Sequence, residues 1–164
     1  MEKLDFRPAK SKKEFRKNYE LHDLAEYHGK NLLTQWGIKF NEFGKDKRYE
    51  AVWEKGKDKP DLVLLINNKK VFLDWKGKKG SKWLANKRAV EAYEMWKEKF
   101  NIPVVIVFFV FDNDKNISDR RIALLGNHPY NLSTGKQWDK NKTVEFINAL
   151  PHFSKQNLLN LTSE

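Results

Sequence analysis

Apolar residues recur at every third or fourth position over residues 11–36, and this spacing predicts an amphipathic helix that ends at Gly37. Residues 38–43 and 48–54 instead alternate apolar and polar side chains on either side of a Gly-Lys-Asp-Lys turn. Alternation of this kind is typical of half-buried strands. These two runs therefore predict a hairpin after the first helix.

Two short continuous apolar runs follow, at 61–66 and 71–76, and Asn-Asn-Lys-Lys separates them. Continuous runs of this length predict strands buried on both faces, and the polar tetrapeptide predicts the turn of a central hairpin. Helical spacing returns over 82–100, and the apolar run 102–111 predicts another fully buried strand.

The remaining pattern predicts a strand at 120–126 and one or two short helices, at about 142–149 and 154–161. Helices and strands in this order predict an α/β fold with a mixed central β-sheet flanked by helices, an extra hairpin on its N-terminal side and a C-terminal helical tail. No repeat or linker divides the chain. We therefore expect one domain over 1–164, with its core at about 20–126 and a C-terminal extension at about 127–164.

Composition narrows the range of functions. The chain has 164 residues, of which 32 are basic and 22 acidic, and its net charge is +10. Such a charge favours a polyanionic partner such as nucleic acid, although a basic surface that only aids solubility is the alternative. Cysteine is absent, so disulfides and thiolate metal sites are excluded. The longest apolar run is too short to span a membrane, and no secretory signal precedes the first helix, so we expect a soluble, cytoplasmic protein.

Two aspartates and a lysine stand out within the central hairpin. Asp74 and Lys76 lie two residues apart and therefore share one face of their strand. A tight turn between the strands brings Asp61 close to Asp74. Two neighbouring carboxylates repel each other unless a cation lies between them, and hard oxygen ligands suit Mg²⁺ or Mn²⁺. A lysine beside such a metal can orient a water molecule or stabilise a phosphate oxygen.

Among the acidic residues of the chain, only Asp74 has a lysine two positions later. A weak surface pair would explain Asp-Trp-Lys on its own. The addition of Pro60-Asp61, thirteen residues before Asp74, favours a functional site.

These residues resemble the signature of the PD-(D/E)xK nuclease superfamily, in which two acids bind the catalytic metal and a lysine completes the site. Residues 20–111 are most similar to archaeal-type Holliday junction resolvases, where a helical glutamate precedes a helix-ending glycine by eleven residues. Glu26 precedes Gly37 by this distance. The resemblance extends to the basic pair Lys87 and Arg88, before a proline-led apolar strand. It implies a restriction-endonuclease-like core.

By this resemblance, the catalytic residues are Glu26, Asp61, Asp74 and Lys76, and the metal ligands are Glu26, Asp61, Asp74 and the main-chain carbonyl of Trp75. The metal is Mg²⁺, for which Mn²⁺ substitutes. Considered without the resemblance, Glu26 is a solvated helix residue or a partner of Lys30, four positions on. Glu20, Glu50 and Glu54 are the fallback candidates for the third acidic ligand.

Basic residues after the lysine predict the contact with nucleic acid. Glycines in the loop 76–82 permit close backbone approach, and its lysines can meet phosphates, although a solvated loop explains them equally well. The predicted nucleic-acid-binding residues are Lys78, Lys79, Lys82, Lys87 and Arg88. Trp83 is a candidate for contact with an opened base. We interpret His22 and His28 as packing residues, with a place on the substrate face of the first helix as the alternative.

The sequence thus predicts a metal-dependent, structure-specific DNA endonuclease that acts in recombination or repair. The resemblance implies that it cuts four-way junctions as a homodimer, because two symmetric incisions need two-fold assembly. A flap, single-strand or restriction-type endonuclease on the same core is the alternative within the class. A catalytically silent DNA-binding module is the alternative outside it.

Overall fold

The structure is a computed structural model that describes residues 9–43, 59–80, 82–138, 141–147 and 149–163. Side chains are described from Glu20 onwards, except over 134–141. The predicted strand at 48–54, and the hairpin that it would complete, lie outside the described residues.

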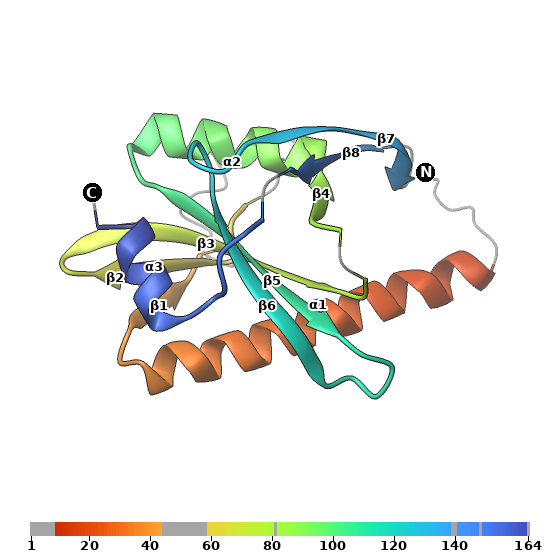
Figure 1. Cartoon of the computed structure of the whole chain (residues 1–164), viewed down its shortest axis with the longest axis horizontal. Coiled ribbons are helices and arrows are strands. Elements are labelled where there is room, and N and C mark those ends of the chain that lie inside the picture. The colour runs from red at the N-terminus through yellow and green to blue at the C-terminus, as the bar shows by residue number, and fades with distance from the viewer. Residues whose placement is uncertain (1–8, 44–58, 81, 139–140, 148, 164) are drawn as a thin grey trace.

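A five-stranded mixed sheet forms the centre of the molecule (Figure 1). Its strands, in spatial order, are β1 (Lys39–Glu42), β2 (Leu62–Ile66), β3 (Lys69–Lys78), β5 (Val104–Phe111) and β6 (Ile117–Leu124). Only β3 and β5 pair in parallel, and the helix α2 (Lys87–Phe100) lies between them in the chain. A parallel pair requires a crossover connection of this kind. The predicted fold, an α/β domain with a mixed central sheet and flanking helices, is confirmed.

Helices cover both faces of the sheet. The helices α1 (Ala9–Gln35) and α3 (Lys155–Leu161) pack on one face, because buried residues of both belong to the same apolar cluster as Leu73 and Trp75. On the opposite face lie α2 and a second sheet of three strands, β4 (Leu84–Asn86), β8 (Asn141–Phe146) and β7 (Tyr130–Trp138). The element order therefore builds two separate apolar cores, one on each side of the central sheet.

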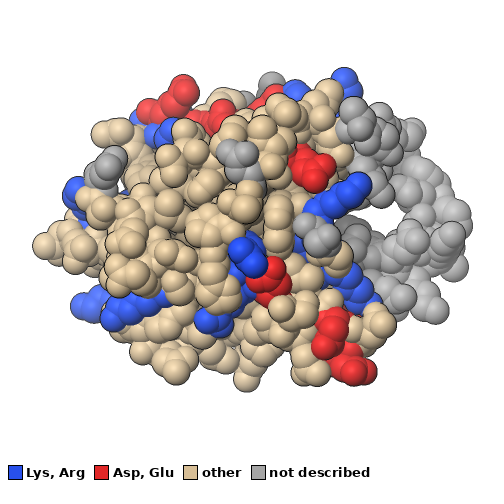
Figure 2. Space-filling model, in the orientation of Figure 1, with Lys and Arg blue, Asp and Glu red and all other residues tan. Residues whose placement is uncertain are grey.

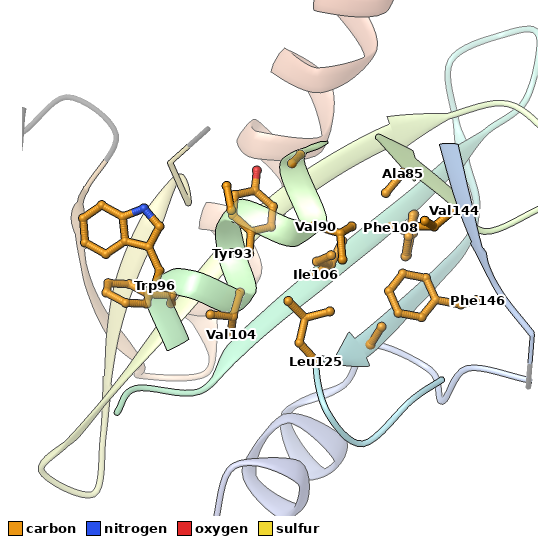
Figure 3. Close-up of a cluster of buried hydrophobic side chains, with 14 of the residues drawn as sticks. Ala85, Val90, Tyr93, Trp96, Val104, Ile106, Phe108, Leu125, Val144 and Phe146 are labelled. Carbon is orange, nitrogen blue, oxygen red and sulfur yellow. The ribbon is translucent and has the colours of Figure 1, made fainter. Parts of the chain in front are cut away.

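Figure 3 shows the core beneath α2, which includes Val90, Tyr93 and Trp96 of the helix and Ile106 and Phe108 of β5. All eight residues of β5 are buried, as the continuous apolar run predicts. The side chains of Val144 and Phe146 enter the same core from β8. The C-terminal extension thus contributes directly to the packing of the central sheet.

Two of the predicted elements are wrong. The segment 142–149 was expected to be helical, but Asn141–Phe146 forms β8, because Val144 and Phe146 alternate with polar residues and pair with β4 and β7. The helix expected from residue 82 begins only at Lys87, since Leu84–Asn86 pairs with β8. The strand β7 was not predicted at all. The short helix expected at 154–161 is confirmed as α3.

The central hairpin has the predicted tight turn. Ile66 pairs with Lys69, so the loop consists of Asn67 and Asn68, and both have positive φ angles, of 51° and 67°. Two consecutive residues of this conformation make the type I′ turn that matches the twist of antiparallel strands, and asparagine tolerates it well.

None of the helices in the described part of the chain is long and apolar enough to cross a membrane.

Candidate functional site

The register of the central hairpin places Asp61 and Asp74 at the same end of the sheet. Leu62, the first residue of β2, pairs with Leu73, so Asp61 directly precedes the paired segment and Asp74 directly follows it on β3. The backbone N–H of Trp75 donates a hydrogen bond of 2.9 Å to Oδ2 of Asp61. The turn at Asn67 and Asn68 therefore brings the two carboxylates together.

Asp74 is almost completely buried, with 4% of its surface exposed. Its Oδ2 lies 3.0 Å from Nζ of Lys76, which is on the same face of β3. This oxygen is buried, and no hydrogen-bond donor of the described residues is aligned with it. Burial raises the pKa of Asp74 to about 7; the charge of Lys76 opposes this shift, and the charge of Asp61 adds to it. The site therefore holds a carboxylate that is only partly compensated by its neighbours.

Asp61 is better supplied with donors. In addition to the Trp75 amide, Nε2 of His22 lies 3.2 Å from the same Oδ2. Burial works to raise the pKa of Asp61, but the hydrogen bonds from His22 and Trp75 outweigh it, so that this pKa lies below its usual range. The hydrogen bond to Asp61 in turn raises the pKa of His22 to about 9, against the effect of burial. Neighbouring aspartates thus have pKa values shifted in opposite directions by their surroundings.

Two glycines allow α1 to approach this end of β3. A Cβ atom on Gly77 would lie 2.0 Å from the backbone oxygen of Leu21, and one on Gly29 would lie 2.2 Å from the ring of Trp75. Any larger residue at either place would push the helix away from the strand. This close packing of α1 on β3 lets His22 reach Asp61.

Glu26 lies on α1 one turn after His22, but the structure does not bring it to the two aspartates. Its carboxylate lies 2.8 Å from Nζ of Lys30, which also contacts Glu42 at the end of β1. The ligand atoms of His22, Asp23 and Glu26 lie within 4.8 Å of one another, and no other group of three in the described residues does. Glu26 therefore has the Lys30 partner that its i,i+4 spacing allows.

The fallback glutamates do not approach the site in the described residues. Glu20 forms an ion pair of 2.5 Å with Lys115, at the turn between β5 and β6. Glu50 and Glu54 lie outside the described residues.

The predicted nucleic-acid-binding residues fall into two groups. Lys78 is held within its own loop, since its Nζ donates to the carbonyl of Gly80 at 2.5 Å and lies 5.2 Å from the ring centre of Trp83. Burial lowers the pKa of Lys78. Lys87 pairs with Glu91 on α2. Exposed residues form the second group: Lys79, Lys82 and Arg88.

Trp83 packs against Phe108 with ring centres 5.4 Å apart, so part of its surface belongs to the core beneath α2.

The face seen in Figure 2 carries acidic and basic side chains intermixed, without a large patch of one sign. The net charge of the chain is therefore not gathered on this face.

His22 is the residue of the site that the sequence analysis did not select. The available signal was its position four residues before Glu26, which places both on one face of a helix. The chain has four histidines, and this spacing did not identify His22 among them. The contact of His22 is with Asp61, which lies 39 residues away along the chain.

The residues at the end of β3 have the chemistry of a site for a hard divalent cation. Carboxylate oxygens are the ligands that Mg²⁺ and Mn²⁺ prefer. The buried Oδ2 of Asp74 has no aligned donor, and the second carboxylate beside it supplies a further oxygen. A cation between the two would compensate both charges, so the residues present fit a metal.

Comparisons with known proteins give a structural likeness and no match to a protein family or a curated protein. No protein-family model and no curated protein matches the chain. Among solved structures, the chain is similar to Hjc of Archaeoglobus fulgidus, a Holliday junction resolvase from an archaeal hyperthermophile. The likeness covers 74% of this chain and 85% of that one, at 11% sequence identity and a TM-score of 0.47. At this level it carries no argument about function, which has to be argued from the site.

Proposed function

We propose that the protein is a metal-dependent endodeoxyribonuclease that hydrolyses phosphodiester bonds in branched DNA. The observation that carries the proposal is the cluster of Asp61, Asp74 and Lys76 at the end of the central hairpin. In this cluster a buried carboxylate oxygen without an aligned donor lies beside a second carboxylate and a lysine.

In the proposed reaction, Asp61 and Asp74 hold one Mg²⁺ or Mn²⁺ ion. When bound, the metal supplies charge stabilisation to the phosphate and favours deprotonation of a water molecule. Lys76 lies 3.0 Å from Asp74 and shares its face of β3, so its ammonium can orient the attacking water and stabilise the negative charge that develops on a phosphate oxygen. Asp74 and Lys76 are held on β3 by its pairing with β5, and the Trp75 amide holds Asp61 beside them, which fixes the spacing of the three side chains.

Further ligands are proposed from the sequence resemblance. The carbonyl of Trp75 and the carboxylate of Glu26 would complete the metal site. For Glu26 this requires release from Lys30, because that ion pair holds its carboxylate. A metal whose charge replaces that of Lys30 would supply the necessary attraction.

The DNA substrate is proposed from charge and from motif spacing. A net charge of +10 suits a polyanion, and the exposed Lys79, Lys82 and Arg88 follow the site lysine along the chain. By the resemblance to archaeal-type Holliday junction resolvases, which rests on the spacing from Asp61 to Asp74 and from Glu26 to Gly37, the substrate is a four-way junction that a homodimer cuts. Two-fold assembly would place one site on each of two symmetric strands.

A cleavage assay tests the proposal. Wild-type protein and Asp74→Ala are incubated with Mg²⁺ and a synthetic four-way junction, a flap, a linear duplex or a single strand, at matched salt. Asp114→Ala, which removes an exposed acid from the turn between β5 and β6, is the matched control. We expect wild type and Asp114→Ala to cut the junction with paired incisions, and Asp74→Ala to leave it intact.

Equal cleavage by Asp74→Ala and wild type would contradict the assignment of the site. Preferential cutting of the flap, single strand or duplex would keep the nuclease and replace the junction as its substrate. DNA binding without metal binding, in a Mn²⁺ titration, would favour a catalytically silent DNA-binding module.

A further inference from the structure

Both ring nitrogens of His22 face carboxylates. Nε2 lies 3.2 Å from Oδ2 of Asp61, and Nδ1 lies 3.6 Å from Oδ1 of Asp23 on the same helix. A histidine between two carboxylates acts as a hydrogen-bond donor, since a carboxylate can only accept. The contact to Asp61 is the one that joins α1 to the proposed metal site.

The position of this ring is set by close backbone packing. A Cβ atom on Gly77 would lie 2.0 Å from the backbone oxygen of Leu21, the residue before His22. The same Cβ atom would lie 3.1 Å from the amide nitrogen of His22. The backbone at His22 therefore packs against β3 at Gly77, the residue that follows Lys76. This packing fixes the backbone from which the ring reaches Asp61.

The two described donors to Asp61 share one oxygen. The Trp75 amide and His22 Nε2 both approach Oδ2, so together they restrict rotation of the carboxyl group about its Cβ–Cγ bond. Oδ1 then faces a direction that β3 and α1 fix jointly. Carboxylates that bind metals are commonly oriented by such a second set of hydrogen bonds, and removal of that support lowers metal affinity.

We propose that His22 is a positioning residue of the metal site, which orients the Asp61 carboxylate so that Oδ1 is presented to the metal. The inference rests on the proposed function, since it gives α1 a role at the same site. Glu26 was expected to bind the metal directly, whereas His22 acts through a hydrogen bond to Asp61.

Calorimetric titration with Mn²⁺ tests the role of His22 without any measurement of cleavage. His22→Leu keeps the bulk of the side chain and removes the donor, whereas His22→Gln retains an N–H donor. His28→Leu is the control, because His28 is another half-buried histidine of α1 but packs against Phe109 and Phe111. We expect His22→Leu to weaken Mn²⁺ binding roughly 10- to 100-fold. His22→Gln should recover most of that loss, and His28→Leu should bind as wild type does.

Unchanged affinity in His22→Leu would overturn the inference, and so would equal losses in His22→Leu and His22→Gln, which a merely structural role would produce. Spin-echo modulation of bound Mn²⁺ separates orientation from ligation. A nitrogen coupling that disappears in His22→Leu would make His22 a ligand and would also overturn the inference.

Failure of the proposed function has a different signature. Wild-type protein that binds no Mn²⁺, or Asp74→Asn that binds it as well as wild type does, would overturn the metal site itself. Binding that depends on Asp74 and is indifferent to His22 would overturn only the role of His22.

Discussion

The two halves of β3 have different neighbours and different chemistry. Residues 69–73, here called the hairpin half, pair with β2 and lead from the turn into the buried run Val71, Phe72 and Leu73. Residues 74–78, the open half, continue beyond the first residue of β2, and among the described strands they pair with β5 alone. Asp74 and Lys76 belong to the open half.

This difference shows why the candidate site lies in one half of β3 and not in the other. In the hairpin half, backbone groups pair with β2 and apolar side chains fill both faces. In the open half, the Trp75 amide finds its partner in the side chain of Asp61 instead. Because a buried amide needs an acceptor and the β2 ladder ends at Leu62, the Asp61 carboxylate accepts from the Trp75 amide in place of a strand. Four substitutions test this contrast.

The largest effect is expected from the lysine of the open half. Lys76→Met should lower the rate of metal-dependent cleavage roughly 100- to 1,000-fold, since it removes a charge that faces the developing negative charge. Mn²⁺ binding should persist, because both aspartates remain. Lys69→Met, an exposed lysine of the hairpin half, is the control and should cut at the wild-type rate. A similar loss in both variants would remove the distinction between the two halves.

The next effect concerns the contact of α1 with the open half. Gly77→Ala should lower the free energy of unfolding by about 2–3 kcal/mol, because the added methyl meets backbone that cannot swing aside. Chemical denaturation measures this loss. Gly80→Asn is the control, because a Cβ there meets no atom within 4 Å and asparagine tolerates a positive φ. Wild-type stability in Gly77→Ala would mean that α1 is not pressed against this strand.

A smaller effect, of opposite sign, is expected for the buried carboxylate. Asp74→Asn removes a charge from a site with 4% exposure, so the metal-free variant should gain about 1 kcal/mol of stability at pH 8. Addition of Mn²⁺ at about 100 times its Kd should stabilise wild type by about 2.7 kcal/mol and leave Asp74→Asn unchanged. Thermal melts with and without Mn²⁺ measure both changes. A less stable metal-free variant would show that the charge is fully compensated within the protein.

The smallest effect belongs to the hairpin half. Asn68→Gly should stabilise the protein by about 0.5 kcal/mol, because Asn-Gly is the preferred sequence for a type I′ turn. Cleavage should not change, since the turn lies at the far end of the strand from Asp74. Loss of activity in this variant would show that the turn, and not only the register it sets, supports the site.

The elements that the sequence predicted well are those whose pattern is local. The continuous run of β5 is apolar at every position, and the Asn67-Asn68 turn carries its own backbone preference, so neither depends on a distant partner. The closeness of Asp61 and Asp74 in space follows from that turn, because the register of a two-residue hairpin fixes which residues face each other.

The elements that it missed depend on residues far away in the chain. Leu84–Asn86 is extended because Ala85 pairs with Val144, about 60 residues later. The strand β7 carries few apolar residues, so its polar sequence Tyr130–Trp138 resembles a loop until β8 lies beside it. The surroundings of Glu26 and His22 on α1 also depend on contacts with residues of other elements. The spacing of α1 alone cannot distinguish a glutamate held by Lys30 from one that faces the aspartates.

Phe153 has a consequence for the order of folding. Its ring is fully buried and lies 5.1 Å from Trp36, 6.2 Å from Trp75 and 6.0 Å from Phe109, measured between ring centres. These aromatic partners come from early, middle and late parts of the chain, so the α1-side core closes only after long loops have formed. Contacts of this separation slow folding, and until Phe153 docks the indole of Trp75 keeps an unfilled side. The backbone that orients Asp61 is therefore expected to become rigid late, together with this core.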